Sequence, residues 1–192
     1  MNFTFIYVAF LIISTVYRLR RITKSYAEEP RPGKVYMPIS YAILLLLYLL
    51  IWTGSVVEYF YLHIQKVNLI ISGIGFLMYV SVIPLRDYAA QTLGKYLSPD
   101  IKIVEGHKLI KEGLYKYIRH PLALSAIIEV VGITLIPNSY YSFLAALFIF
   151  LPYMLFRIHL EEKALTEKFG QEYIDYKKEV SAFLPFKKRI SK

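Results

Sequence analysis

The sequence predicts an all-α integral membrane protein with about five transmembrane helices. Hydrophobic residues make up 56% of the 192 residues, and the mean hydropathy is +0.44. The apolar residues gather in runs long enough for helices that cross a hydrocarbon core of ~30 Å. The lysine and arginine residues gather in alternate connections between these runs. This combination is typical of a multi-pass membrane protein and not of a soluble one.

The apolar runs place the five expected spans at residues 1–17, 38–61, 67–85, 122–136 and 140–158. A basic cluster follows the first run instead of preceding it, so we expect a retained span and not a cleaved signal peptide. The polar segment 22–36 contains a Pro-Arg-Pro-Gly sequence and is predicted to be a loop. The polar segment 86–119 is predicted to be a long loop, and loops of that length are more often functional than idle.

The last two runs form a predicted helical hairpin, because Pro137-Asn-Ser139 turns the chain between them. Beyond Arg157 the sequence becomes amphipathic, with Gly170 as a stop between two pieces. We therefore expect cytoplasmic amphipathic C-terminal helices. The apolar residues that share a face are Leu160, Ala164, Leu165 and Phe169 on the first piece, and Tyr173, Tyr176, Val180 and Phe183 on the second. Residues 1–192 are expected to form a single membrane domain, with three spans in 1–85 and the remaining elements in 86–192.

The distribution of positive charge predicts the orientation. Lysine and arginine number six in the first connection, seven in the third and nine in the C-terminal tail, whereas Lys66 alone lies in the opposite connections. The positive-inside rule then places the N-terminus outside and the C-terminus in the cytoplasm. The net charge of +9 is explained by topology, so membrane lipids are expected as neighbours and nucleic acid is not. We expect a prokaryotic plasma membrane, with the active site facing the cytoplasm.

Several classes of chemistry are excluded by composition and motif. Cysteine is absent, which excludes disulfides, thiolate metal sites and a cysteine nucleophile. The sequence also lacks the P-loop, dinucleotide-binding, zinc-protease and nucleophile-elbow motifs. Four histidines are too few for a histidine-rich di-iron site. A single metal held by His107, His120, His159 and a glutamate stays open, although we expect no metal.

The polar residues predicted on the cytoplasmic side combine cations with carboxylates. Such a set suits a zwitterionic cofactor, because its carboxylate needs arginine or histidine donors and its ammonium needs a glutamate. Binding of lipid headgroups by Lys116 and Arg119 is the alternative. The set consists of Arg86, His107, Tyr115, Arg119, His120, Arg157, His159, Glu161 and Glu162.

Two features inside the predicted spans leave two interpretations each. An ionisable residue within a span, such as Glu129, is costly unless it faces a cavity or a partner. Glu129 could line a lipid-access tunnel or bond a neighbouring helix. The small residues Ser72-Gly-Ile-Gly75 could allow close helix packing, or they could leave backbone open for a ligand.

The segment His107-Lys-Leu-Ile-Lys-Glu-Gly-Leu-Tyr-Lys-Tyr-Ile-Arg-His-Pro121 resembles the H-x-L-[VI]-x-x-G-x-Y-x-x-x-R-H-P signature of the isoprenylcysteine carboxyl methyltransferase family and its phospholipid methyltransferase relatives. The resemblance covers residues 86–185. It includes Arg86, Leu93-Gly94, Arg157-x-x-x-Glu161-Glu162, Phe169-Gly170, Tyr173, Tyr176 and Phe183-Leu-Pro185; Gly73-x-Gly75 is weakly similar to a phospholipid methyltransferase element. The family pattern continues with x-Tyr after R-H-P, and this chain has Leu122-Ala123.

The resemblance implies S-adenosylmethionine as the methyl donor and a lipophilic acceptor such as a prenylcysteine-like carboxylate. A carboxylate acceptor needs no general base, and Arg157 would orient it; an amine acceptor would need a base such as Glu162, His159 or Glu129. Arg157 and Glu162 are the predicted catalytic residues, and Glu129 and Arg86 are candidates for the substrate site. The predicted cofactor-binding residues are His107, Leu109, Gly113, Tyr115, Arg119, His120, Pro121, Glu161 and Glu162. Alternatives are a phospholipid-amine methyltransferase, an NADPH-dependent sterol-type reductase and a non-enzymatic lipid-binding protein.

Overall fold

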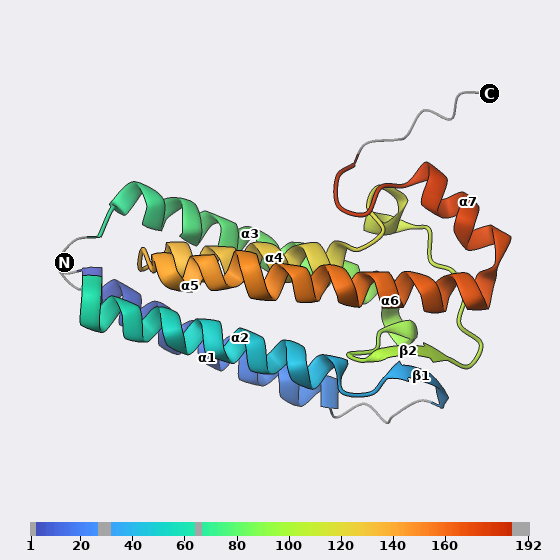
Figure 1. Cartoon of the computed structure of the whole chain (residues 1–192), viewed down its shortest axis with the longest axis horizontal. Helices are drawn as coiled ribbons and strands as arrows, with labels where there is room; N and C mark the ends of the chain where they lie inside the picture. The colour runs from blue at the N-terminus through green and yellow to red at the C-terminus, as the bar shows by residue number, and fades with distance from the viewer. Residues whose placement is uncertain (1–2, 27–31, 64–66, 186–192) are drawn as a thin grey trace.

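A computed structural model gives the structure of residues 3–26, 32–63 and 67–185. Long helices lie side by side along one direction, and a small sheet and the last helix lie together at one end of the bundle (Figure 1). The helices are α1 (Phe3–Tyr26), α2 (Ser40–Glu58), α3 (Leu69–Leu93), α4 (Pro121–Leu135), α5 (Tyr140–Ala145), α6 (Leu151–Phe169) and α7 (Gln171–Glu179). The strands are β1 (Gly33–Met37) and β2 (Ile101–Val104).

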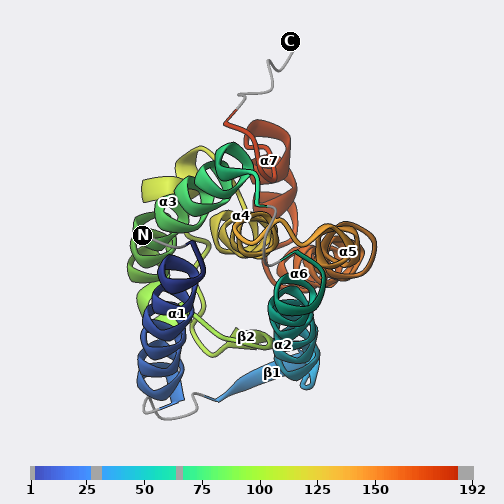
Figure 2. The same ribbon diagram turned by 90° about the vertical axis from the view of Figure 1, so that its left-hand side faces the viewer.

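Short turns of tighter or wider helix connect these elements. A π-helical turn, Tyr59–His63, continues α2, and another, Ala146–Phe150, joins α5 to α6 into one long helical stretch. Two 3₁₀ turns, Gly94–Tyr96 and Gly113–Lys116, flank the connection that contains β2. Seen along the bundle, α4 lies in the middle, where it contacts α2, α3, α5 and α6 (Figure 2).

The distribution of apolar and polar side chains supports a membrane location. Three helical stretches, Ser40–Tyr61, Leu69–Tyr96 and Tyr140–Phe169, are long and apolar enough to cross a bilayer, and Phe3–Tyr17 and Pro121–Leu135 are shorter apolar helices. Only 22% of the apolar window in each long stretch is buried. Meanwhile small polar side chains such as those of Ser55, Ser125 and Thr134 are inside the bundle. Because many large apolar side chains are exposed on these helices while small polar ones are buried, lipid is the environment that suits this surface. The protein is a mostly helical, multi-pass membrane protein.

Close packing of α3 against α4 depends on a pair of glycines. A Cβ atom added to Gly75 would lie 2.8 Å from the carbonyl oxygen of Gly132, and one added to Gly132 would lie 2.9 Å from that of Gly75. Gly73 has nothing within 4 Å of its Cβ position. The prediction of close helix packing is therefore confirmed for Gly75, while Gly73 faces open space.

Buried polar groups fix the predicted hairpin at the end of the bundle opposite the sheet. The Glu58 carboxylate accepts hydrogen bonds from the backbone N–H groups of Tyr141 (3.1 Å) and Ser142 (3.0 Å). These N–H groups belong to the first turn of α5 and have no partner within the helix. Asn138, at φ 61°, accepts from the backbone of Asn68 at 2.7 Å and donates to the Ser72 hydroxyl at 2.9 Å. The hairpin between 122–136 and 140–158 is thus confirmed.

The prediction of an all-α fold is wrong at the two polar segments. Residues 22–36 do not form one loop, because α1 continues to Tyr26 and β1 begins at Gly33. β1 pairs antiparallel with β2, and the partners run from Gly33 with Val104 to Met37 with Ile101. Lys34 on the same strand forms an exposed ion pair with Glu167 on α6 at 2.5 Å.

The prediction of a loop over residues 86–119 is also wrong for its first residues. α3 continues through Arg86 to Leu93. The helix does not end at the charged Arg86, because the Arg86 guanidinium has partners on α4. Its Nε donates to the Ser125 hydroxyl at 3.1 Å, and its Nη2 forms an ion pair with Glu129.

The final helix is shorter than predicted. α7 ends at Glu179, and Val180 is extended, so Phe183 does not continue the helix. The chain leaves the helix because residues 181 and 182 pair with another segment: their carbonyl oxygens accept from the backbone N–H groups of Arg119 (2.9 Å) and His120 (3.1 Å).

Candidate functional site

A cavity of about 200 Å³ lies at the end of the bundle where the sheet and α7 meet the helices. Its wall combines the start of α4, the middle of α6, β2, α7 and the connection from Tyr96 to Tyr115. Eight residues predicted to belong to the site line it: His107, Leu109, Tyr115, Arg119, His120, Pro121, Arg157 and Glu161.

The lining of the cavity divides into a polar part and an apolar part. Asp100, Lys102, His107, Arg157 and Glu161 contribute charged or polar side chains. The apolar part comes from three helices of the bundle, with Leu44 on α2, Ala123 and Ala126 on α4, and Met154 and Ile158 on α6. Such a cavity can hold a polar group and an apolar chain at the same time.

Glu161 and Glu162 have different surroundings because consecutive residues of a helix point about 100° apart. The Glu161 side chain is 45% exposed and lines the cavity, and its carboxylate lies 3.8 Å from Nδ1 of His120. The Glu162 side chain is 11% exposed and is absent from the cavity wall. Its carboxylate accepts from Arg119 Nη2 at 2.8 Å, His120 Nε2 at 3.1 Å and Lys177 Nζ at 2.5 Å. We call Arg119, His120, Glu162 and Lys177 the Glu162 cluster.

The Arg119 guanidinium joins three parts of the chain. Besides Glu162 on α6, it bonds backbone at the end of α7: Nη1 donates to the carbonyl oxygen of Lys177 at 3.1 Å and to that of Val180. Its side chain is 8% exposed. Arg119 therefore holds α7 against α6 as well as lining the cavity.

Arg157 is held at the edge of the cavity by the start of α2. Its Nη1 donates to the Ser40 hydroxyl at 3.0 Å, and its Nη2 donates to the carbonyl oxygen of Pro99. The Tyr153 hydroxyl donates to the Ser40 carbonyl oxygen at 2.8 Å. Asp100 accepts from the backbone N–H of Tyr41 at 3.1 Å. These contacts fix the cation before any ligand binds.

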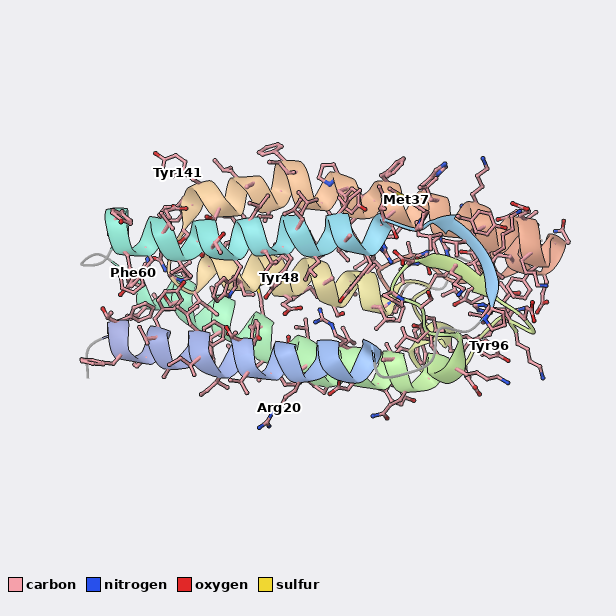
Figure 3. All side chains as sticks on the ribbon, turned by 90° about the horizontal axis from the view of Figure 1, so that it is seen from below. Arg20, Met37, Tyr48, Phe60, Tyr96 and Tyr141 are labelled. Atoms are coloured by element: carbon pink, nitrogen blue, oxygen red, sulfur yellow. The ribbon has the colours of Figure 1, made fainter. Side chains whose placement is uncertain are left out.

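The His107 imidazole is held between two aromatic rings. It stacks on Tyr96, with ring centroids 4.8 Å apart, and meets the edge of Phe169 at 5.8 Å. Figure 3 shows Tyr96 at the sheet end of the bundle. Burial lowers the pKa of His107, opposed by nearby Glu161 and aided by Lys168. Its Nδ1 is buried and has no hydrogen-bond partner among the residues that the structure describes.

Three buried tyrosines complete the wall near α7. The Tyr176 hydroxyl donates to the carbonyl oxygen of Tyr115 at 2.6 Å. Burial raises the pKa of Tyr176 to about 12 and raises those of Tyr115 and Tyr173 further, so all three phenols stay neutral. The Tyr173 hydroxyl has no partner within the described part of the chain.

The other predicted site residues lie outside the cavity. Gly113, at φ 57°, backs onto Thr92, whose Oγ1 would lie 2.9 Å from an added Cβ, so this glycine shapes the turn before Tyr115. Arg86 and Glu129 pair beside a separate small cavity lined by Tyr17, Tyr79, Val82 and Ile83. The ion pair confirms that Glu129 bonds a neighbouring helix, and Arg86 and Glu129 themselves line this small cavity.

His159 is exposed and does not line the cavity. Within residues 3–26, 32–63 and 67–185, no three histidine, aspartate or glutamate side chains are arranged to hold a metal ion.

Comparison with known proteins identifies the region that forms this cavity. Residues 74–167 match the model of the isoprenylcysteine carboxyl methyltransferase (ICMT) family. Over these residues the chain is similar to the ICMT family. It is 34% identical over 103 residues to the protein-S-isoprenylcysteine O-methyltransferase of Saccharomyces cerevisiae, covering 53% of this chain and 43% of the yeast protein. It is 33% identical over 118 residues to protein-S-isoprenylcysteine O-methyltransferase B of Arabidopsis thaliana, covering 60% of each.

The fold is also similar to a solved member of the family. The structure of the eukaryotic intramembrane Ras methyltransferase ICMT superposes with a TM-score of 0.60 at 25% sequence identity, covering 79% of this chain and 54% of that one. The chain therefore spans about half the length of these ICMT relatives.

Some lining residues were not predicted from the sequence. Asp100 and Lys102 lie in the connection before and within β2, and the signal that could have found them is the position of this connection just upstream of His107. No sequence signal connects Leu44, on α2, with the site. Ala123 lines the cavity, so the departure from the family's x-Tyr pattern falls on the cavity wall.

Proposed function

We propose that the protein is an integral-membrane S-adenosylmethionine-dependent methyltransferase that methylates a prenylcysteine-like carboxylate on a lipophilic acceptor. The observation that carries this proposal is the two-part cavity, most of whose lining residues lie in the region similar to the ICMT family. Its charged and aromatic residues can bind a polar donor, and its aliphatic residues on α2, α4 and α6 can receive an apolar chain from the bilayer. The names of the ICMT relatives support the same reaction.

The residues at the polar part fit the methyl donor. The partly exposed Glu161 carboxylate suits its ammonium group, and the buried rings of Tyr115 and Tyr173 suit its planar base. The Nδ1 of His107, which has no hydrogen-bond partner among the described residues, can accept from a ligand in one tautomer and donate to it in the other. We propose direct contact by His107, Leu109, Tyr115, His120, Pro121 and Glu161. When bound, the donor supplies a methyl group already activated by a sulfonium.

The Glu162 cluster is proposed to hold residues of the cavity wall in place, although Glu162 itself does not line the cavity. Glu162 bonds both Arg119 and His120, so it fixes two neighbours of the donor site without lining the cavity itself. Gly113 sets the turn that places Tyr115. We therefore propose that Arg119, Gly113 and Glu162 position the residues that touch the donor.

Arg157 is proposed to orient the acceptor carboxylate. It lines the same cavity as Ala123 and Met154, and its contacts with Ser40 and Pro99 hold the guanidinium in place. Methyl transfer is an in-line displacement, and alignment of the reactants can contribute roughly 7–11 kcal/mol. The aliphatic wall excludes water, which would otherwise solvate the attacking carboxylate. A carboxylate needs no general base.

The site is proposed to face the cytoplasm. The sheet, α7 and the cavity share one end of the bundle (Figure 1). In the sequence, the two connections and the tail on the predicted cytoplasmic side contain thirteen and nine of the 23 lysine and arginine residues. The positive-inside rule places this end in the cytoplasm.

Binding and methylation assays test the proposal together. The protein purified in detergent should bind S-adenosylhomocysteine by calorimetry and should not bind NADPH. With labelled S-adenosylmethionine, label should appear in a prenylcysteine. Transfer to a phospholipid amine instead would overturn the proposed acceptor, and binding of NADPH without S-adenosylhomocysteine would overturn the methyltransferase itself.

A further inference from the structure

The Tyr173 hydroxyl is a buried polar group that makes no hydrogen bond to the part of the chain that the structure describes. Tyr173 is on α7 and is 1% exposed, and it is one of the residues that line the cavity. Buried hydroxyls in folded proteins are nearly always bonded, because leaving one unsatisfied is costly. The hydroxyl therefore needs an explanation beyond the packing of its ring.

Tyr176, one turn further along α7, shows what a structural hydroxyl does in this helix. It donates to the Tyr115 carbonyl oxygen at 2.6 Å and so joins α7 to the turn before α4. Both rings pack in the same apolar cluster, with Val180, Leu109, Leu165 and Phe169. A phenylalanine would satisfy that packing at position 173. The hydroxyl of Tyr173 is the part that packing does not explain.

The chemistry of the Tyr173 hydroxyl suits a neutral ligand group. Burial and the nearby carboxylates of Glu162 and Glu161 keep the phenol protonated, so it can donate a hydrogen bond at any physiological pH. His107 lines the same cavity with a buried Nδ1 that also lacks a partner in the described chain. A ligand that offers both donors and acceptors could satisfy both groups. The nucleoside and amino-acid parts of an S-adenosyl compound offer both.

We propose that the Tyr173 hydroxyl is a direct binding contact for the methyl donor, which makes α7 part of the donor site. This inference rests on the proposed methyltransferase function. It also explains the contacts between α7 and the Glu162 cluster. Arg119 donates to the carbonyl oxygens of Lys177 and Val180 and so holds Tyr173 at the cavity wall.

Substitution of single hydroxyls tests the inference. Tyr173→Phe should weaken S-adenosylhomocysteine binding by about 5- to 10-fold in calorimetry, as expected for the loss of one hydrogen bond. The melting temperature of the ligand-free protein should stay the same or rise, because the change removes an unsatisfied buried group. Tyr176→Phe is the matched control on the same helix. It should lower the melting temperature of the ligand-free protein, because it removes the bond to Tyr115.

Two results would overturn the inference alone. One is equal affinity of the wild-type and Tyr173→Phe proteins for S-adenosylhomocysteine. The other is a fall in the ligand-free melting temperature of Tyr173→Phe as large as that of Tyr176→Phe, which would make the hydroxyl structural. Failure of the wild-type protein to bind S-adenosylhomocysteine would instead overturn the proposed function and the inference with it.

Discussion

Arg119 Nη2 lies 2.8 Å from Glu162 Oε1, so two residues that the sequence predicts as cofactor ligands are already bonded to one another. Their side chains are 8% and 11% exposed, and His120 and Lys177 share the same carboxylate. The adjacent Glu161 keeps its carboxylate at the cavity. The two glutamates therefore have different roles: Glu161 lines the cavity, and Glu162 bonds residues of the cavity wall to one another.

Glu162→Gln should destabilise the protein strongly. It leaves the buried Arg119 guanidinium without its counter-ion, and breaking a buried pair costs roughly 3 kcal/mol or more. Thermal unfolding in detergent should show a large fall in melting temperature. Glu167→Gln, on the same helix, is the control, because Glu167 pairs with Lys34 on the exposed surface and such pairs contribute little. Equal melting temperatures for both variants would contradict the structural role of Glu162.

Glu161→Gln should have the opposite effect. The melting temperature should change little, because the side chain is 45% exposed. Affinity for S-adenosylhomocysteine should fall about 10- to 100-fold, since a hydrogen bond to a charged group contributes roughly 1.5–3 kcal/mol. Calorimetry measures this directly. Unchanged affinity would show that Glu161 does not hold the donor.

Removal of one partner from the Arg86–Glu129 pair should destabilise the bundle without affecting donor binding. Glu129→Leu leaves a charged arginine between α3 and α4, at a cost of several kcal/mol. The double variant Arg86→Met with Glu129→Leu should recover most of the loss, because it leaves no unpaired charge. Melting temperatures of the single and double variants measure the recovery. If the melting temperature of the double variant stays as low as that of Glu129→Leu, then the packing of α3 against α4 depends on the ion pair itself and not only on the absence of an unpaired charge.

The stability of the protein should fall in mild acid because of His107. Its folded-state pKa lies below the usual value of roughly 6.5. Between these two values the unfolded chain binds a proton that the folded protein does not, so the free energy of unfolding falls as the pH drops through this window. The melting temperature should fall between pH 7.5 and 5.5. His107→Gln should reduce the difference between the melting temperatures at pH 7.5 and pH 5.5. If this difference were unchanged in the variant, His107 would not be the neutral, buried group described above.

The sequence predicted the helices better than it predicted the cavity. Apolar runs predicted the stretches 38–61, 122–136 and 140–158, because burial in lipid requires continuous apolar residues. β1 and β2 were missed, since two short strands pair only when residues 33–37 meet residues 101–104, far along the chain. Arg86 was assigned to a loop because its charge suggested water, whereas Glu129 supplies its partner inside the bundle.

The division between Glu161 and Glu162 was also beyond the sequence. Both follow the family motif, and which one faces the cavity depends on the rotation of α6 about its axis. The resemblance to the family implied that His107, Tyr115, His120 and Glu161 belong to one site, and all four line the cavity. The sequence could not predict that the Arg119 guanidinium would bond Glu162 and the backbone at the end of α7.

Ala123 should control the size of the acceptor that the cavity receives. It lines the apolar part beside Ala126 and Met154, at the position where the family pattern has a tyrosine. Ala123→Tyr places a bulky ring against this wall, so prenylcysteines with a long apolar chain should lose more activity than those with a short one. Since small differences in an apolar pocket change kcat/KM by 10-fold or more, the ratio of kcat/KM for the two chain lengths should shift about 10-fold. Calorimetry should give S-adenosylhomocysteine the same affinity in both proteins, and a loss of that affinity with no shift in the ratio would place Ala123 at the donor and not at the acceptor.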